Sequence, residues 1–325
     1  MRMTMKSLTA AALVLSLGTA RPLFADDVAT QIVDAMNQVF GKHPGYRANH
    51  AKGIVVEGHF QAAPDAKALS KASIFNGSVI PVVVRFSDAT GVPDISDGAS
   101  NANPHGMAIK FKPTGSGETD MVINSLKFFP VATGEDFRDL LLAIAASPAS
   151  APKPTALDKF IAAHPSVSAA LATAITPTSF ADEEYYGIDA FNLVNAAGKK
   201  QAVRYQMVPA TLRHLKPDEA AKMPKDFLID ELPGRIAKGP VVFHLNAQLA
   251  DAGDVTRDPS KPWPDDRKRV DLGTLTLDKV VPDSHAAEKP LLFLPTNLVD
   301  GIELTDDPLP SIRAAAYAIS FARRQ

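Results

Sequence analysis

Residues Ile80–Ser87 read IPVVVRFS, an apolar run of β-branched and aromatic residues that contains one arginine, Arg85. A run of this composition predicts a β-strand. A guanidinium within such a strand must be paired or must face a cavity, because an unpaired buried charge is strongly destabilising. The stretch therefore predicts a strand whose arginine has an anionic partner.

Segments of similar character occur on both sides of this strand. Further strands are predicted at Gly53–Phe60, Met107–Phe111, Met121–Asn124, Asn192–Asn195, Ala202–Val208, Pro240–Leu249 and Arg269–Leu277. The residues Asn195–Gly198 (NAAG) between two of them are a hairpin signature. No glycine-rich turn of the dinucleotide-binding type joins a strand to a helix. About eight strands without such turns favour an antiparallel β-barrel.

Helical segments are inserted between the strands and follow them. Apolar spacing predicts helices over 28–40 and 134–146, short helices within 155–185, and a last helix that begins near Pro308. The fold class is therefore α+β, an antiparallel β-barrel of about eight strands with inserted and C-terminal helices.

The N-terminus resembles a secretory signal peptide. Arg2 and Lys6 precede the apolar run Leu8–Leu17, which is followed by small residues and then by Asp26 and Asp27. We expect residues 1–25 to be the signal peptide, residues 26–325 to form one domain, and the location to be periplasmic or secreted. No later segment approaches the ~20 apolar residues of a membrane helix, so no membrane span is expected.

The amino-acid composition excludes some classes of function. The chain has no cysteine, which excludes a peroxide-reducing thiol. A formal net charge of -2 argues against nucleic acid as a partner and favours a small molecule. The oligomeric state is left open.

The last predicted helix carries Arg313, Tyr317 and Arg324, whose spacings of four and seven place them on one face. The three alanines between the first two keep the surface low enough for a flat cofactor. An arginine one turn away and a ferric ion would together stabilise a tyrosine phenolate, a hard donor that favours Fe(III). By itself this spacing also fits ordinary helix packing. His50, considered alone, fits a structural histidine as well as a site residue.

A set of motifs in a fixed order resembles the haem catalases. They are Arg47–Gly53 (RANHAKG), Val84–Ser87 (VRFS), Pro104–Ala108 (PHGMA), Asp120–Asn124 (DMVIN) with Phe128 and Phe129, Asp258–Pro264 (DPSKPWP), Leu272–Leu275 (LGTL), Asn297–Glu303 (NLVDGIE) and Arg313–Tyr317 (RAAAY). The resemblance extends from about residue 40 to the C-terminus. Because full catalases continue well beyond the position of Arg324, the chain is most similar to the small catalase-related peroxidases.

This resemblance implies a β-barrel that binds haem b, with Tyr317 as the iron ligand. The implied catalytic residues are His50 and Asn124 on the distal side, with Ser87 hydrogen-bonded to the histidine. The implied cofactor-binding residues are Arg47, Arg85 and Arg324 at the haem propionates, Phe128, Phe129 and Phe137 along the pocket, and Arg313 beside the ligand. The implied substrates are a small peroxide and an organic electron donor.

Two departures from full catalases affect the expected activity. The spacing from Asn124 to the phenylalanine pair is one residue shorter, and Asp189 stands where full catalases have a histidine. We therefore predict a haem peroxidase that reduces organic hydroperoxides and hydrogen peroxide, with weak or no catalase activity. Two alternatives stay open: an isomerase or dehydratase of fatty-acid hydroperoxides on the same barrel, and an exported barrel that binds haem or another ligand without turnover.

Overall fold

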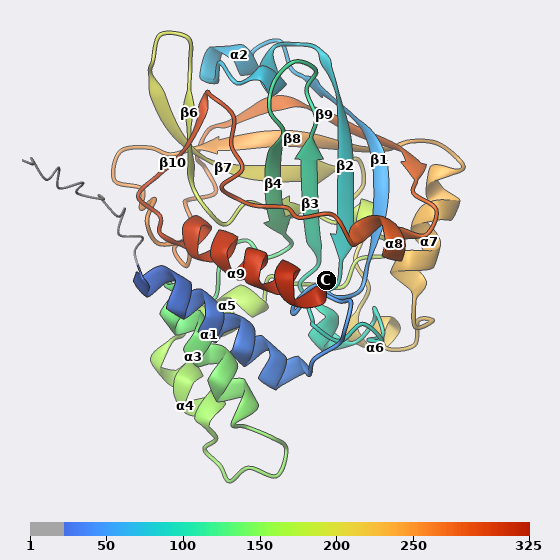
Figure 1. The fold of residues 1–325 in the computed structure, drawn as a ribbon, viewed down its shortest axis with the longest axis vertical. Helices are drawn as coiled ribbons and strands as arrows, with labels where there is room; N and C mark the ends of the chain where they lie inside the picture. The colour runs from blue at the N-terminus through green and yellow to red at the C-terminus, as the bar shows by residue number, and fades with distance from the viewer. Residues whose placement is uncertain (1–22) are drawn as a thin grey trace, which may run out of the picture.

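The computed structural model describes residues 23–325, in which one antiparallel sheet closes into a barrel (Figure 1). The strands are β1 (Gly53–Ala62), β2 (Val79–Ser87), β3 (Gly106–Phe111), β4 (Thr119–Asn124), β5 (Tyr185–Tyr186), β6 (Phe191–Val194), β7 (Lys200–Pro209), β8 (Val241–Leu249), β9 (Arg269–Val280) and β10 (Ile302–Leu304). Their order is β10-β6-β7-β5-β4-β3-β2-β1-β9-β8, and β7 also pairs with β8. That pairing closes the eight strands from β7 to β8 into a ring, which confirms the predicted barrel. Strands β6 and β10 extend it at one edge.

The barrel interior is filled by alternate side chains of the strands, as the two-residue period of a strand requires. On β2 these are Val82, Val84 and Phe86, which are fully buried in the main hydrophobic core. The side chains between them, including Arg85 and Ser87, point out of the barrel and are also buried. Both faces of β2 are therefore covered, which explains why its sequence is almost continuously apolar.

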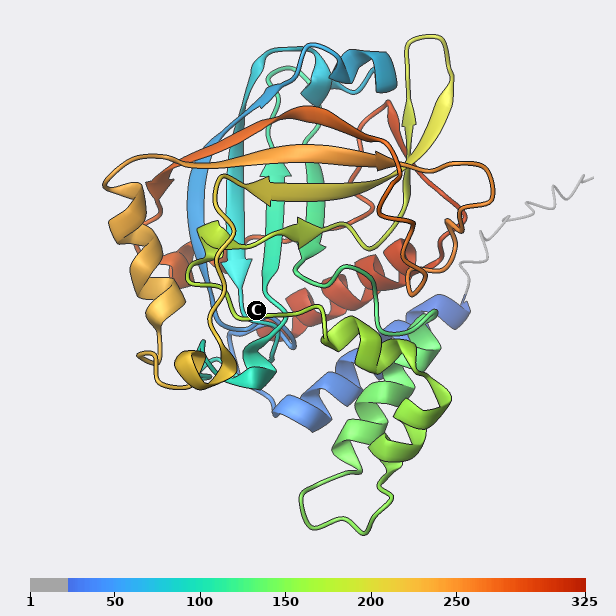
Figure 2. The same cartoon turned by 180° about the vertical axis from the view of Figure 1, so that it is seen from behind.

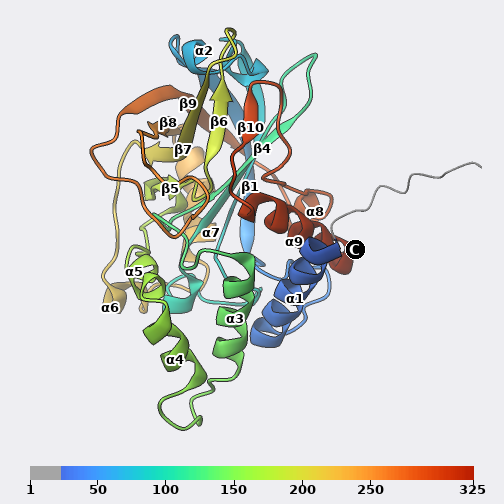
Figure 3. The ribbon, with the colours of Figure 1, turned by 90° about the vertical axis from the view of Figure 1, so that its left-hand side faces the viewer.

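Helices lie at both ends of the barrel and along its side (Figures 2 and 3). They are α1 (Leu23–Phe40), α2 (Ala66–Leu69), α3 (Gly134–Ala145), α4 (Ala156–Ala163), α5 (Ser166–Leu171), α6 (Pro217–Ala220), α7 (Phe227–Ile236), α8 (Ser284–Glu288) and α9 (Leu309–Arg324). Single 3-10 turns occur at 73–75, 100–102 and 180–182.

Helix α1 packs along α9 and also contacts α3 (Figure 3). Ala29 and Val33 of α1 meet Ala316 of α9, and Ile32 contacts Ile312. Small residues at these positions let α1 and α9 approach closely. This packing holds α9 in place from the side opposite the barrel.

The structure confirms the predicted long strands, the hairpin between β6 and β7, and the last helix. It differs at Tyr185–Tyr186, expected among short helices, which pairs with β4 and β7 as strand β5. Strand β10 and helix α7, which has Pro233 inside it, were not predicted. The predicted signal peptide falls largely on residues 1–22, outside the described part of the chain. None of the helices within residues 23–325 is long and apolar enough to span a membrane.

Candidate active site

A cavity lies between the outward face of strands β2 to β4 and helix α9. It contains about 1200 Å³ of empty space, its open mouth included. All the site residues of the predicted catalytic, cofactor-binding and metal-ligating sets line it: His50, Asn124, Ser87, Arg47, Arg85, Phe129, Phe137, Arg313, Arg324 and Tyr317. The fold thus brings together residues that are separated by up to 277 positions in the sequence (Arg47 to Arg324).

The strand register builds the distal wall of this cavity. Ser87 of β2 pairs with Gly106 of β3, and Gly106 pairs with Asn124 of β4, so the three residues form one row across the sheet. Two residues further along, Arg85 pairs with Ala108 and points to the same side. The middle of the row carries no side chain, because its residue is glycine.

The imidazole of His50 occupies the space above Gly106. A Cβ atom at Gly106 would lie 2.9 Å from His50 Nδ1 and 2.8 Å from Ser87 Oγ. Ser87 Oγ and His50 Nδ1 are hydrogen-bonded at 3.0 Å. The backbone of His50 is in the left-handed region, with φ at 56°, and its N–H donates to Ala89 O at 3.3 Å. A non-glycine residue in this conformation marks a position where the surroundings fix the side chain.

The electrostatic environment keeps His50 neutral. Burial and the positive charge of Arg85 lower the pKa of His50 to about 3. A neutral imidazole has one nitrogen free to accept a proton. Beside it, Asn124 accepts a hydrogen bond from Leu126 N at its Oδ1 (2.8 Å). The amide oxygen is thereby fixed, and the Nδ2 donor of Asn124 is left for the cavity.

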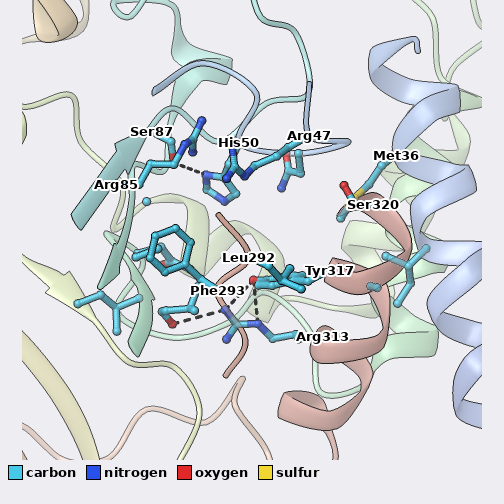
Figure 4. A pocket seen from close by; sticks show the side chains of 18 of the residues that line it. Met36, Arg47, His50, Arg85, Ser87, Leu292, Phe293, Arg313, Tyr317 and Ser320 are labelled. Atoms are coloured by element: carbon cyan, nitrogen blue, oxygen red, sulfur yellow. Dashed lines mark hydrogen bonds between the residues drawn. The ribbon is translucent and has the colours of Figure 1, made fainter. Parts of the chain in front are cut away.

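Tyr317 lies on the opposite side of the cavity from His50 (Figure 4). Arg313, one turn earlier on α9, donates to Tyr317 Oη from Nε (3.1 Å) and Nη2 (2.8 Å). The third guanidinium nitrogen, Nη1, forms an ion pair with Asp189. Burial alone would lower the pKa of Arg313, but Asp189 and Tyr317 raise it. A permanent cation therefore contacts the phenol oxygen, as the sequence spacing predicts.

Three arginines gather at one end of the cavity. Arg47 and Arg85 both form ion pairs with the buried Glu288, the former at 2.9 Å. Arg324 donates from Nη2 to Leu291 O (2.7 Å), while its Nε is buried without an acceptor. Burial and the neighbouring Arg85 lower the pKa of Arg47 to about 8. One carboxylate for three guanidinium groups leaves a positive excess, which suits an anionic ligand.

Apolar side chains complete the cavity. Phe129 and Phe137 are in contact, with ring centroids 5.1 Å apart. Phe128, which we expected beside them, is not among the lining residues. Its neighbour Phe129 faces the cavity, and Phe128 lies in the bend that precedes it. A mostly apolar cavity with a few converging polar groups and cations at one end is the general form of a ligand or cofactor site.

Comparisons with known proteins identify the family. The family model described as Catalase matches residues 9–324. The chain belongs to the catalase family. A "Catalase-related peroxidase" of Synechococcus elongatus is 36% identical over 321 residues, which cover 97% of this chain and 94% of the relative. A "Catalase-related peroxidase" of Mycolicibacterium paratuberculosis is also 36% identical, over 90% of this chain and 94% of the relative.

Longer members of the catalase family share the fold. A solved "Structure of a bacterial catalase" superposes with a TM-score of 0.77 at 23% identity. The superposed region covers 100% of this chain and 67% of the chain in that solved structure. A "Catalase" of Pseudomonas syringae is 29% identical over 93% of this chain but only 61% of the relative. The chain therefore matches the small catalase-related type over its length, and this part of the prediction is confirmed.

Two residues of this catalase-family site were not predicted. Glu288 bridges Arg47 and Arg85, but nothing in the sequence around it (SHAAEKP) indicates a buried carboxylate. Gly106 lies within a motif that was recognised, yet its role follows only from the strand register. A glycine at the start of a predicted strand, which often marks a close approach, was the one available signal.

The close approach at Gly106 gives a prediction. We expect Gly106→Ala to displace His50 or Ser87 and to reduce peroxide turnover by roughly 10- to 100-fold, because misplacement of a catalytic group by about 1 Å has effects of this size. Steady-state assays of the haem-loaded variant measure it. Gly234→Ala on α7 is the matched control, since no atom lies within 4 Å of its added Cβ. Normal turnover in Gly106→Ala would contradict the arrangement.

Proposed function

We propose that the chain is a haem-dependent peroxidase. It reduces organic hydroperoxides and hydrogen peroxide with electrons from an organic donor, and has weak or no catalase activity. The observation that supports this most directly is the arrangement of the cavity, with neutral His50 on one side and an arginine-bound Tyr317 on the other (Figure 4). Two relatives that are 36% identical carry the name "Catalase-related peroxidase", which supports a peroxidase activity.

The donor set of the cavity fits haem b. Haem is a flat apolar ring with two carboxylates at one edge, and the cavity offers apolar walls with a positive excess at one end. Arg47, Arg85 and Arg324 would hold the propionates, and the buried Arg324 Nε is a donor that still lacks an acceptor. Phe129 and Phe137 would contact the ring.

Tyr317 would hold the haem iron through its phenol oxygen. Arg313 already donates two hydrogen bonds to its phenol oxygen, and hydrogen bonds to an oxygen favour its anionic form. A phenolate is a hard, anionic ligand that favours ferric iron. Bound haem would supply the electrons that are needed to cleave the O–O bond of the peroxide.

The distal residues would handle the proton. His50 would accept the proton of the hydroperoxide and deliver it to the outer oxygen, so that water or an alcohol leaves. Ser87 would hold the imidazole in place through its 3.0 Å hydrogen bond. Asn124 would donate from Nδ2 to the polarised peroxide, since its Oδ1 is engaged with Leu126 N.

Two assays test the proposal together. The haem-loaded protein is mixed with an organic hydroperoxide and a dye donor, and separately with hydrogen peroxide in an oxygen electrode. We expect dye oxidation with alcohol as the product and little oxygen release. Rapid oxygen release without dye oxidation would show that the catalase activity exceeds the peroxidase activity, and would contradict the proposal. Rearrangement of a fatty-acid hydroperoxide without consumption of donor would favour the isomerase or dehydratase instead.

The lowered pKa of His50 gives a pH prediction. The proton-accepting form of a histidine is the neutral form, which predominates above its pKa. With a pKa of about 3, His50 is neutral above about pH 4, so we expect the rate of reaction with peroxide to be constant between about pH 5 and about pH 8. Stopped-flow absorbance at the haem band measures this rate. A fall centred on the ordinary histidine pKa of 6.5 would show that His50 is protonated much more easily than its burial implies.

We also propose that residues 1–25 are a signal peptide and that residues 26–325 are the exported haem-binding domain. The basic residues at the N-terminus, the apolar run Leu8–Leu17 and the acidic residues Asp26 and Asp27 after it support this. The mass of the protein recovered from the periplasm or medium tests it. A full-length mass, or retention in the cytoplasm, would contradict it.

A further inference from the structure

Behind the distal wall of the cavity lies a second group of ionisable side chains, which the proposed chemistry does not use. Asp88 directly follows Ser87, and His105 directly precedes Gly106, so both adjoin the row that supports His50. Asp88 and His105 are completely inaccessible to solvent. They are joined to the protein surface by Glu183, which is nearly buried, and by His214, whose side chain is 26% exposed.

The central members of this group lack hydrogen-bond partners. Both ring nitrogens of His105 and both carboxylate oxygens of Asp88 are buried without one. A buried polar atom without a partner is destabilising, so four of them in one place need an explanation. They are also arranged in sequence: His105 Nε2 lies 3.6 Å from Asp88 Oδ1, and His105 Nδ1 lies 4.0 Å from Glu183 Oε2.

The outer part of the group is connected by a full hydrogen bond. Glu183 Oε1 and His214 Nε2 are 3.1 Å apart. The two inner gaps are slightly longer than a hydrogen bond, and a small side-chain rotation brings atoms at these separations into hydrogen-bond distance. The imidazole of His105 has one nitrogen directed to each carboxylate, as a proton carrier requires.

We propose that His214, Glu183, His105 and Asp88 form a proton relay that connects the protein surface with the distal side of the cavity. The proposal rests on the proposed function. Reduction of a hydroperoxide by a donor follows ROOH + 2e⁻ + 2H⁺ → ROH + H₂O. The organic donor supplies the two electrons. The proton of the hydroperoxide ends on the alcohol, and the two further protons must reach the oxygen that leaves as water. The relay brings them to Ser87 and His50 from behind, without passage through the apolar cavity.

The direction of transfer follows from the charges around each member. A proton enters from solvent at His214, whose pKa is raised by its hydrogen bond to Glu183. Burial raises the pKa of Glu183, so this carboxylate can carry the proton inward. His105 accepts it at Nδ1 and releases a proton from Nε2 to Asp88. Burial, followed by the charge of a protonated His50, lowers the pKa of His105 to about 3, so the ring passes a proton on and does not retain it.

Asp88 is the inner store of the relay. Burial and the neighbouring Asp97 raise its pKa to about 8, while Lys52 and Arg85 act in the opposite direction. Lys52 itself forms ion pairs with Asp97 and Asp226, which limits its effect on Asp88. At neutral pH the Asp88 carboxyl therefore holds a proton, next to Asp97 and one residue along the chain from Ser87. Tyr185, Asp182 and Glu184 complete the charged and titratable groups near the relay.

Two variants at the outer end test the relay without altering the core: Glu183→Gln and His214→Gln. His244→Gln is the matched control, because His244 is 52% exposed on β8 and has an acidic neighbour at 3.9 Å. In the haem-loaded protein we expect both relay variants to reduce hydroperoxides about tenfold more slowly, with a larger solvent deuterium isotope effect. Added imidazole should restore the rate of a His214→Ala variant, which it could not do if His214 had only a structural role.

A second readout does not depend on peroxide turnover. The pH is jumped from above to below the pKa of Asp88, about 8, and a pH-indicator dye follows proton uptake by the protein. We expect uptake to be slower in Glu183→Gln and His214→Gln than in the wild type and in His244→Gln. Unchanged uptake rates in both relay variants would overturn the relay, as would unchanged turnover and isotope effect in an active enzyme. Slowed uptake in a protein that does not reduce peroxides would support the relay and contradict the proposed function.

Discussion

Tyr317→Phe is expected to lower hydroperoxide reduction by about 10³-fold, which corresponds to about 4 kcal/mol of activation free energy. The phenylalanine ring fills nearly the same space, but it offers no oxygen to a metal and no acceptor to Arg313. The absorption spectrum of the haem-loaded variant should lose the phenolate-to-iron character of the wild type. Steady-state rates and the spectrum together measure the effect.

The same substitution has an effect that is independent of haem. Arg313 donates two hydrogen bonds to Tyr317 Oη. Removal of this hydroxyl leaves the buried Nε donor of Arg313 without an acceptor, while Nη2 keeps its 3.4 Å contact with Val122 O. We expect the free energy of unfolding of the haem-free protein to fall by roughly 1–3 kcal/mol. Tyr205→Phe is the control, because the Tyr205 hydroxyl is buried without a partner and its loss should be neutral. A wild-type spectrum and rate in Tyr317→Phe would show that another residue binds the iron.

The long strands and the last helix could be predicted because their signals are local. The run at Ile80–Ser87 is apolar on both faces, since the barrel core covers one face and the cavity residues and α9 cover the other. Strands β5 and β10 could not be predicted in the same way. They contain two and three residues, and their existence depends on partners such as Asn124 and Leu193, which are distant in the sequence. Short strands of this kind are defined by tertiary pairing and not by composition.

In the candidate site, too, contacts between residues close in the sequence could be predicted, and contacts between distant residues could not. Arg313 and Tyr317 are one helical turn apart, so their contact follows from helix geometry alone. The contact between Arg85 and Glu288 joins residues 203 positions apart, and no sequence pattern encodes it. The relation of Ser87, Gly106 and Asn124 required the register of three strands, although each residue lies in a recognisable motif. Family resemblance identified residues one at a time, and the structure supplied the distances between them.

His50→Gln is expected to reduce the rate of reaction with hydroperoxides by about 10²–10⁴-fold, the usual contribution of a general acid–base group. Glutamine can still accept a hydrogen bond from Ser87 Oγ, but it cannot take up a proton near neutral pH. Arg47, Arg85 and Tyr317 remain intact in this variant, so haem binding and the resting spectrum should be unchanged. This separation of binding from reactivity distinguishes His50→Gln from Tyr317→Phe, which should alter both.

Two further substitutions make the His50 experiment specific. His59→Gln on the outside of β1 removes a partly exposed histidine and should leave the rate unchanged. Ser87→Ala removes only the 3.0 Å hydrogen bond to His50, and we expect a smaller loss, of about tenfold. We expect the rate to be lowest in His50→Gln, intermediate in Ser87→Ala and highest in the wild type. The reason is that the imidazole transfers the proton, whereas the hydroxyl only orients the imidazole. If His50→Gln and Ser87→Ala were equally impaired, the hydroxyl itself would have to carry the proton, and Asp88, the next residue, would be its immediate source.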